Sequence, residues 1–307
     1  MCKYRTFVYA MVVQRAVRGT AGRDAFVPRI AVTVAFVFVL ASVGLFIRYI
    51  DHIANIIRAA TIVTYIGQLS RSVLERRYPR DIVEAPALDP LPEAGRTVPA
   101  PHPGVVVLVN EPVLVTLAAA ADAVVALVPQ VGDSVPGGGA LFTVHLDTGQ
   151  SENDVAALAQ LDKRLLGEVA LATEPTMEQD LAFGFRQLVD IAERALSPAI
   201  NDPTTAAQTL DVLHDLLRRL ATRHLPEGRF TGPDGRLRLV VPQYGFADFL
   251  EVAIGEIWRY GSDAAQIPAR INVLLTDLAS AALPEHRGAV DRWITLVGHA
   301  PAIAHRA

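Results

Sequence analysis

One short stretch concentrates the side chains of this sequence that could do chemistry. Ser197, Asn201, Asp202 and Thr205 place a hydroxyl, an amide, a carboxylate and a second hydroxyl within nine residues. The pair Asp202-Pro203 predicts a helix that starts here, with the aspartate as N-cap and the proline at the first helical position. Because a helix N-terminus presents free N–H groups and partial positive charge, this stretch could hold an anionic ligand.

The residues just before this stretch add charged groups at helical spacing. Arg186, Asp190 and Arg194 recur every four residues, so they share one face of a predicted helix and are expected to form an ion-pair ladder. The candidate ligand-binding residues are therefore Arg186, Asp190, Ser197, Asn201, Asp202 and Thr205.

A purely structural interpretation of the same residues stays open. Asp202 could simply cap its own helix, and Ser197 could hydrogen-bond the preceding turn. The arginines could hold two helices together rather than bind a ligand. The sequence does not decide between a ligand site and a helix boundary.

The sequence contains few of the patterns that mark catalytic or metal-binding sites. No G-x-S-x-G pattern occurs, and Ser197 is followed directly by Pro198 with no neighbouring general base. His214 has Asp211 and Asp215 beside it, but His214 and Asp215 point to different faces of the helix and no H-E-x-x-H pattern appears. We therefore predict no catalytic residue, no metal site and no cofactor.

Mainly helical elements are expected to position the candidate residues. Thr176 and Gln179 have the spacing of a capping box ahead of the helix that carries Arg186. The apolar periodicity predicts a mainly helical domain over 174–307, with one strand at 237–241. Its helices are expected at 183–196, 202–223, 246–260, 264–283 and 287–296.

A small β module is predicted over 104–173, after a proline-rich linker over 80–103. Gly132 to Leu141 fits the G-D-x-V-x-x-G-x-x-L hairpin of barrel-sandwich domains, a group that includes lipoyl and biotinyl carriers. A carrier needs a lysine at a hairpin tip, and no lysine lies between Lys3 and Lys163. The module is therefore expected to be barrel-sandwich-like and structural. Its strands are expected at 105–109, 123–128, 141–146 and 168–172, and its helices at 111–121 and 154–166.

A membrane span is predicted close to the N-terminus. Ile30 to Ile47 is a run of eighteen uncharged residues between Arg29 and Arg48. With Tyr49 and Ile50 the run reaches about twenty residues, enough at about 1.5 Å each to cross roughly 30 Å of hydrocarbon. A signal peptide would have a shorter apolar core, and a soluble protein rarely covers such a helix on every face. We expect a transmembrane helix over 28–50.

The segments on either side of this span extend the membrane interpretation. The apolar residues Phe7 to Val13 predict the remnant of a preceding span over 1–18, although a short interfacial helix is the alternative. Apolar residues at helical spacing predict an amphipathic helix over 51–79, which Pro79 ends. We expect one long helix from the span to Tyr78, leaving the bilayer as a helical stalk.

Charge separates the two parts of the chain. Residues 1–80 hold twelve Lys and Arg against three acids, whereas residues 81–307 hold sixteen against twenty-nine. The basic part suits anionic membrane lipids, and the acidic part argues against nucleic acid as a partner. Cys2 is the single cysteine, so no disulfide framework forms. Basic residues are equally numerous on both sides of the span, so the positive-inside rule leaves its orientation open.

The motif ALSPAINDPTTA, from Ala195 to Ala206, resembles the hallmark of a bacterial predicted-membrane-protein family, domain of unknown function 2254. The segments FVYAMVVQRAV, AVTVAFVFVLASVGLFIRYIDHIA and RLRLVVPQYGFADFL extend the similarity over most of the chain. The resemblance implies a bacterial inner-membrane protein with several N-terminal spans and a cytoplasmic domain. This chain begins inside what would be the third span, which implies a truncated or misassigned start. No activity comes with the family.

These observations predict an α+β membrane protein and three functional hypotheses. The first is a cytoplasmic domain that binds a small-molecule or protein ligand and passes its state to the span. The second is an oligomeric channel or transporter, because small residues along the span allow close helix packing, although no ionisable residue marks a pathway. The third is a membrane-bound enzyme with a site near Ser197 to Asp202. Expected partners are membrane lipids and a second copy of the chain.

Overall fold

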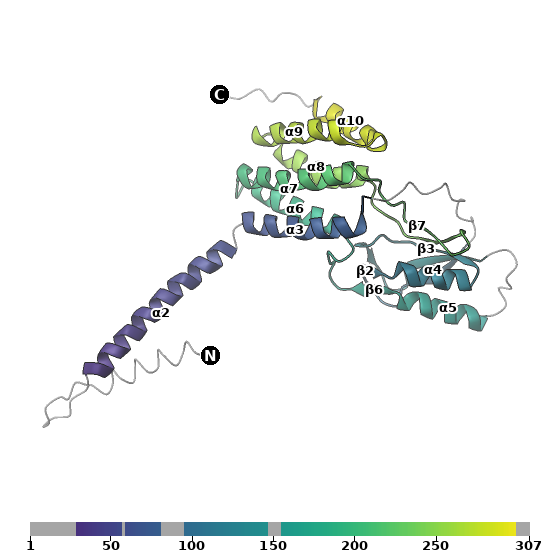
Figure 1. The fold of residues 1–307 in the computed structure, drawn as a ribbon, viewed down its shortest axis with the longest axis horizontal. Helices are drawn as coiled ribbons and strands as arrows, with labels where there is room; N and C mark the ends of the chain where they lie inside the picture. Colours follow the sequence, from purple (N-terminus) through teal and green to yellow (C-terminus); the bar gives the residue numbers. More distant parts are fainter. Residues whose placement is uncertain (1–28, 57–58, 81–94, 147–154, 299–307) are drawn as a thin grey trace. The chain divides into compact units, whose positions relative to one another are not determined.

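The computed structural model describes residues 29–56, 59–80, 95–146 and 155–298 (Figure 1). The chain divides into two compact units, residues 1–62 and 63–307, which are taken in turn. The expected remnant of a preceding span over 1–18 lies outside the described residues. So do residues 57 and 58, and with them the expected continuity of one helix from 28 to 78.

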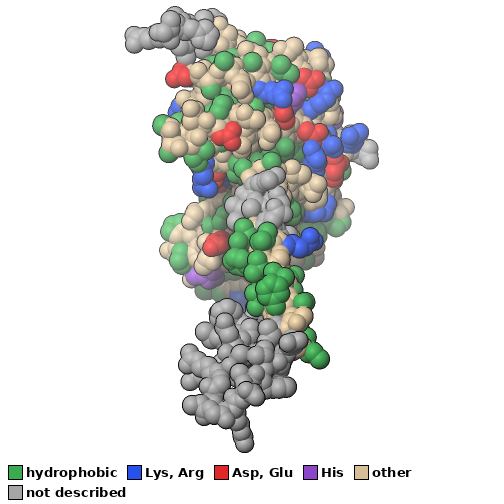
Figure 2. All heavy atoms as spheres, turned by 90° about the vertical axis from the view of Figure 1, so that its left-hand side faces the viewer, with side chains coloured by type: hydrophobic (Ala, Val, Ile, Leu, Met, Phe, Trp, Pro, Cys, Tyr) green, Lys and Arg blue, Asp and Glu red, His purple; other side chains and the backbone are tan. Residues whose placement is uncertain are grey.

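In the first unit the structure describes α2, which runs from Arg29 to Ile56, and residues 59–62, where the helix of the second unit begins. Its stretch from Thr33 to Ile50 is long and apolar enough to cross a membrane, by length and composition. Large side chains on it are exposed, among them Phe36 at 62% and Leu45 at 65%. Figure 2 shows hydrophobic side chains of this helix in green. The helix predicted over 28–50 is therefore present, with bounds a few residues wider.

The second unit contains a helical core and a β core. The helical core is built by α3 (Ala59–Arg77), α6 (Leu181–Leu196), α7 (Pro203–Ala221), α8 (Phe246–Gly261), α9 (Gln266–Ala281) and α10 (Pro284–Gly298). Figure 1 shows α3, the α6–α7 pair, α8 and the α9–α10 pair stacked on one another. Their buried side chains form one continuous cluster, with Phe185, Leu213, Phe249 and Ile271 fully covered. The helices predicted between 183 and 296 are confirmed within a few residues at each end.

Helix α3 is part of this core and is not a free stalk, which corrects the expectation for 51–79. Its apolar side chains Val63, Ile66, Val73 and Leu74 are all buried in the helical core. The helix is amphipathic as predicted, but its apolar face packs on the other helices of the core. A helix covers such a face wherever a partner is available, because each buried aliphatic side chain contributes about 1.5–3 kcal/mol.

Two glycines let α3 approach its neighbours closely. A Cβ on Gly67 would lie 2.6 Å from Val212 Cγ1, which is on α7. A Cβ on Gly184 of α6 would collide with the Ser70 hydroxyl and lie 3.3 Å from Ser70 Cβ. Side chains at either position would push α3 away from the core.

A ladder of charged groups joins α3 to α7. Arg71 binds Asp215 at 2.7 Å, and Arg219 bridges Asp215 at 3.0 Å and Glu75 at 3.2 Å. The ladder ends at Arg223, whose side chain is fully buried and binds Glu75 at 2.7 Å. These pairs run in the same order along both helices, so α3 and α7 are parallel.

The β core contains two open sheets with α4 (Glu111–Ala120) and α5 (Val155–Gly167). The larger sheet has the order β1-β5-β3-β8-β7, and β3 and β8 are parallel, whereas its other neighbouring strands are antiparallel. The smaller sheet has the order β4-β2-β6. The strands are β1 (Arg96–Pro99), β2 (Gly104–Val109), β3 (Ala123–Leu127), β4 (Ser134–Val135), β5 (Ala140–Leu146), β6 (Val169–Ala172), β7 (Arg229–Thr231) and β8 (Leu237–Val240).

The expected barrel-sandwich-like module is corrected in two respects. Within the described residues the larger sheet ends at β1 on one side and at β7 on the other, so it does not close into a barrel there. The two arms of the Gly132 to Leu141 hairpin separate, because β4 pairs with β2 while β5 pairs with β1 and β3. Moreover, β8 completes the sheet although it follows α7 in sequence, so the division expected between 173 and 174 does not separate the two cores. Strand β1 lies within the expected linker over 80–103.

The start of α6 also differs from the expected capping box. Asp180, not Thr176, is the N-cap, and its Oδ1 accepts a hydrogen bond from the Phe183 N–H at 2.9 Å. The amide of Gln179 instead binds both the N–H and the carbonyl of Val109, at 2.9 and 3.2 Å. Gln179 therefore links the segment just before α6 to the end of β2.

The close contact at Gly184 generates a test with an internal control. We expect Gly184→Ala to destabilise the folded unit by about 1–3 kcal/mol, because the added methyl group collides with Ser70. Gly288 on α10 has open space around its Cβ position, so Gly288→Ala should be neutral or stabilise by up to about 1 kcal/mol through helix propensity. Urea unfolding in mild detergent, followed by the fluorescence of Trp258 and Trp293, measures both effects. Equal effects of the two substitutions would contradict this packing.

Candidate functional site

The polar residues of the ALSPAINDPTTA motif bind one another and cap helices. Asp202 is the N-cap of α7, and its two oxygens accept from the Thr205 N–H at 3.1 Å and the Thr205 hydroxyl at 2.5 Å. These bonds lower the pKa of the Asp202 carboxyl. The Ser197 hydroxyl donates to the Arg194 carbonyl at 2.7 Å. Asp202 and Ser197 therefore make the capping bonds that the structural interpretation expected, and ligand binding by them stays a prediction.

The backbone of the same loop is equally well satisfied. The Asn201 N–H donates to the Ser197 carbonyl at 2.8 Å, and the Asp202 N–H donates to the Ala195 carbonyl at 2.7 Å. Asn201 closes the turn with a φ of 48°, in the left-handed region that asparagine tolerates better than most residues. Its side chain is exposed.

The remaining predicted residues lie elsewhere on α6. Arg186 precedes Ser197 by eleven residues, which separates their backbones by about 16 Å along the helix. Asp190 is exposed and forms no ion pair with Arg186 or Arg194 in the described part of the chain, so the expected ladder is absent. The structure thus does not bring the six predicted residues together.

The polar side chains around His214 connect α7 to neighbouring helices through ion pairs. His214 binds Asp277 on α9 at 2.8 Å, while Asp215 binds Arg71 on α3. Asp211 pairs with Arg270 at 2.6 Å. Across the residues that the structure describes, no group of three or more His, Cys, Asp or Glu side chains could hold a metal ion.

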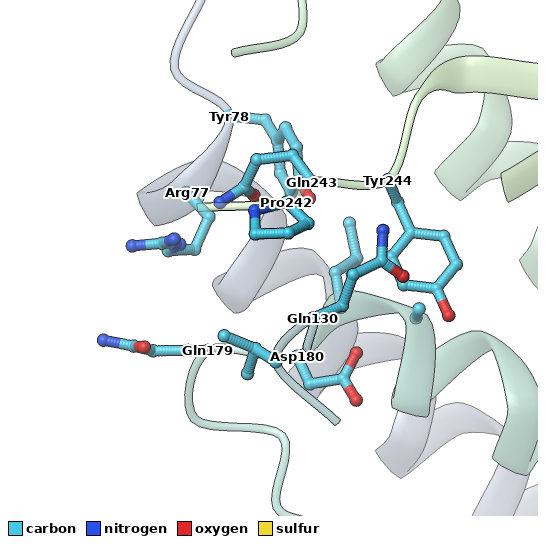
Figure 3. Close-up of a pocket in the computed structure, with 11 residues that line it drawn as sticks. Arg77, Tyr78, Gln130, Gln179, Asp180, Pro242, Gln243 and Tyr244 are labelled. Atoms are coloured by element: carbon cyan, nitrogen blue, oxygen red, sulfur yellow. The ribbon is translucent and has the colours of Figure 1, made fainter. Parts of the chain in front are cut away.

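Arg186 instead contacts Asp180 and Tyr244, two residues that line a small polar hollow between the helical core and the β core (Figure 3). Its cavity volume is about 20 Å³, room for about one water molecule or one ammonium group, and it opens to solvent. In Figure 3 the Asp180 carboxylate and the Tyr244 hydroxyl lie on one side, and Arg77 and Gln179 extend to the other. Four segments line it: the end of α3, the loop after β3, the start of α6 and the loop after β8, namely Arg77, Tyr78, Gln130, Val131, Gln179, Asp180, Leu181, Ala182, Pro242, Gln243 and Tyr244.

Asp180 is the most unusual group at this hollow. Its side chain is only 3% exposed, and its Oδ2 is buried without a hydrogen-bond partner among the described residues. Arg186 Nη2 lies 3.7 Å from this oxygen, which is too far for a hydrogen bond. Burial raises the pKa of the Asp180 carboxyl. A buried acceptor without a donor costs about 1–3 kcal/mol, so the position calls for an explanation beyond folding.

A glycine turn covers this carboxylate. Gly132 has a φ of 98°, which strains any other residue, and a Cβ there would fall on Asp180 Oδ2. The first glycine of the hairpin pattern therefore allows the loop of the β core to press onto the N-cap of α6. A larger residue at this position would displace the carboxylate or open the loop.

Arg186 and Phe249 support the two tyrosines that line the hollow. Arg186 Nη1 donates to the Tyr244 hydroxyl at 3.2 Å, and its guanidinium lies 5.8 Å from the ring centre. The ring centres of Tyr244 and Phe249 lie 5.4 Å apart, and those of Tyr78 and Phe249 lie 5.8 Å apart with the rings edge to face. Burial raises the pKa of Tyr78, so its phenol stays neutral.

The end of α3 closes the hollow and ties the two cores together. Arg77 forms a bidentate pair with Glu111 at the start of α4, at 2.7 and 3.1 Å. The next residue, Tyr78, receives a hydrogen bond on its carbonyl from Arg223 at 2.5 Å. The hollow offers an acceptor, a cation and aromatic edges, but none of its lining side chains makes a nucleophile–base pair.

The sequence did not single out Asp180, Tyr244 or Gln130 as site residues. Their roles depend on four segments that meet only in the fold. Gly132, within the recognised hairpin pattern, was the one local signal near them. Only Arg186, among the six predicted residues, lies beside the hollow.

The described residues thus define an α+β protein with one helix long and apolar enough to cross a membrane and a polar hollow between two cores. The family model described as "Predicted membrane protein (DUF2254)" matches residues 4–277. The chain belongs to this family, as the motif in 195–206 indicated.

Relatives in two mycobacteria support the same assignment. The chain is 33% identical over 297 residues to the uncharacterized protein Mb1321c of Mycobacterium bovis and to the uncharacterized protein Rv1290c of Mycobacterium tuberculosis. The match covers 95% of this chain and 56% of each relative, so the chain spans little more than half of their length. No solved structure matches the chain.

A carboxyl pair between α6 and α8 gives the folded unit a pH dependence. Burial, the adjacent Glu256 carboxyl and the charge of Asp190 raise the pKa of Glu193 to about 7, and Arg259 opposes them. A carboxyl with a raised pKa stabilises the fold while it is protonated. Its contribution is complete below the ordinary pKa of 4.5 and is lost as the pH rises to about 7.

We therefore expect Glu193→Gln to flatten the pH dependence of stability. The free energy of unfolding of the wild-type chain should fall between about pH 4.5 and 7. In the variant, position 193 no longer titrates, so the fall should be smaller. Thermal unfolding at half-unit pH steps measures the difference. Glu251→Gln, on the exposed face of α8, controls for the loss of one acid. An unchanged slope in Glu193→Gln would contradict the assignment.

Proposed function

We propose that the chain is a bacterial inner-membrane protein, anchored by the stretch from Thr33 to Ile50, whose folded unit faces the cytoplasm. In this proposal the folded unit binds a small polar ligand at the hollow beside Asp180 and passes its state to α3. Supporting the anchor are the length and exposure of the apolar stretch and the family description. Supporting a cytoplasmic position are the family resemblance and a single cysteine in the sequence.

One observation carries the proposed coupling: the helix that follows the apolar stretch in sequence also lines the hollow. Arg77 and Tyr78, at the end of α3, share it with Asp180 and Tyr244. A ligand that shifts these side chains would act directly on α3. Because α3 is packed and ion-paired against α7, such a shift would move the whole helix and not only its last residues.

The chemistry of the hollow favours a ligand with an N–H donor. Asp180 Oδ2 is an acceptor without a donor, and a donated hydrogen bond from a charged or neutral N–H would satisfy it. The Arg186 guanidinium, with 42% of its side chain exposed, adds a site for an anionic or carbonyl group of the same ligand. Small amines and amino acids combine such groups.

The test uses two aspartates that are both helix N-caps. Asp180→Asn keeps the capping oxygen but removes the buried charge, and Asp202→Asn makes the same change at the start of α7, away from the hollow. We expect a panel of small amines and amino acids, screened by thermal shift on the full chain in detergent, to contain a compound that stabilises the wild type and Asp202→Asn alike. Its affinity for Asp180→Asn should fall at least tenfold. Equal stabilisation of Asp180→Asn would contradict binding at this carboxylate.

A further inference from the structure

The loop of the ALSPAINDPTTA motif presents apolar side chains outward. The side chains of Ser197, Asp202 and Thr205 form hydrogen bonds within the loop and its flanking helices. Between them Pro198, Ala199 and Ile200 are all exposed, and Ile200 is 53% exposed. A tightly hydrogen-bonded turn thus holds an apolar tip, defined here as residues 198–200, at the surface.

A second large side chain is exposed at the same end of the helical core. The last turns of α6 and α8 touch, because a Cβ on Gly261 would lie 2.9 Å from Leu196 Cδ1. Tyr260, next to that contact, is 61% exposed. The 198–200 tip and Tyr260 therefore project from neighbouring helix ends.

The chain also enters the helical core at this end. The contacts of Gly67 with Val212 and of Arg71 with Asp215 make α3 parallel to α7, which begins directly after the 198–200 tip. The first buried residue of α3, Val63, thus belongs to the same end as the start of α7. Figure 2 looks onto this side of the folded unit, where hydrophobic side chains stand between charged ones.

We propose that this end of the helical core docks on the lipid bilayer, with Ile200 and Tyr260 in the membrane interface. The inference rests on the proposed anchoring by Thr33 to Ile50, and not on ligand binding at the hollow. Twelve residues separate Ile50 from Val63 in the sequence. Even fully extended, the thirteen steps from Ile50 to Val63 span no more than about 47 Å, so the entry end of the core is tethered near any bilayer that the apolar stretch crosses.

The chemistry of the surface favours lipid as the occupant. A tyrosine with an exposed ring and an aliphatic side chain on a rigid turn are typical of the zone between headgroups and acyl chains. The exposed charges of Arg194 and Arg259 are offset by those of Asp190, Glu256 and Asp263. We therefore expect docking on uncharged phosphatidylcholine, without a need for anionic lipid.

Depth-dependent fluorescence quenching on the full chain tests the proposal. In a Cys2→Ser background, single cysteines replace Ile200, Tyr260, Val128 or Leu40 and carry an environment-sensitive fluorophore. Val128, on the β core, is 48% exposed and is the matched control for Ile200, while Leu40 reports the anchor. Each labelled chain is placed in nanodiscs of phosphatidylcholine with or without brominated acyl chains, and iodide is the aqueous quencher.

We expect brominated lipid to reduce the fluorescence at positions 200, 260 and 40 at least twofold and to leave position 128 unchanged. Quenching at position 40 but not at 200 and 260, with iodide reaching both, would overturn the docking and leave the anchor intact. Protection of position 200 from iodide without lipid quenching would also overturn it, because a protein surface would then cover the tip. No lipid quenching at position 40 would refute the anchor itself and the docking with it.

Discussion

The close approach of α3 to α6 and α7 is the contact on which the rest of the folded unit depends. It is possible only because Gly67 and Gly184 leave room for Val212 and Ser70. It is then fixed by Arg223, a fully buried cation that binds both Glu75 and the carbonyl of Tyr78. A buried guanidinium is tolerated only with such partners, so its position selects one register of α3.

This contact determines where the hollow forms. With α3 seated, Arg77 reaches Glu111 on the β core and Tyr78 reaches the aromatic cluster of the helical core. The hairpin loop can then press Gly132 onto Asp180, which leaves one carboxylate oxygen buried and without a donor among the described residues. This carboxylate therefore lies where the two cores and α3 meet. A shift of the helical core, the β core or α3 would therefore change the contacts of the other two.

Local patterns predicted most elements, but not how they assemble. Helical periodicity located α6 to α10 within a few residues, and alternation located β2, β3, β5, β6 and β8. The pairing of β8 with β3 joins residues more than one hundred positions apart, and no local signal encodes it. The same limit applies to α3, whose amphipathic face fits a stalk as well as a core helix. At the candidate site, the motif around Asp202 is conspicuous because helix caps use the same polar residues as binding sites, whereas Asp180 becomes unusual only through burial under Gly132.

Amide hydrogen exchange along α3 tests the central claim, that this helix is an integral part of the folded unit, most directly. In the full chain in mild detergent, the amides from Val63 to Leu74 should exchange as slowly as those of α7, within about tenfold. Protection of α3 and α7 should also be lost together as urea is added, because the two helices share one core. Fast exchange along α3 while α7 stays protected would show a free stalk and contradict the account.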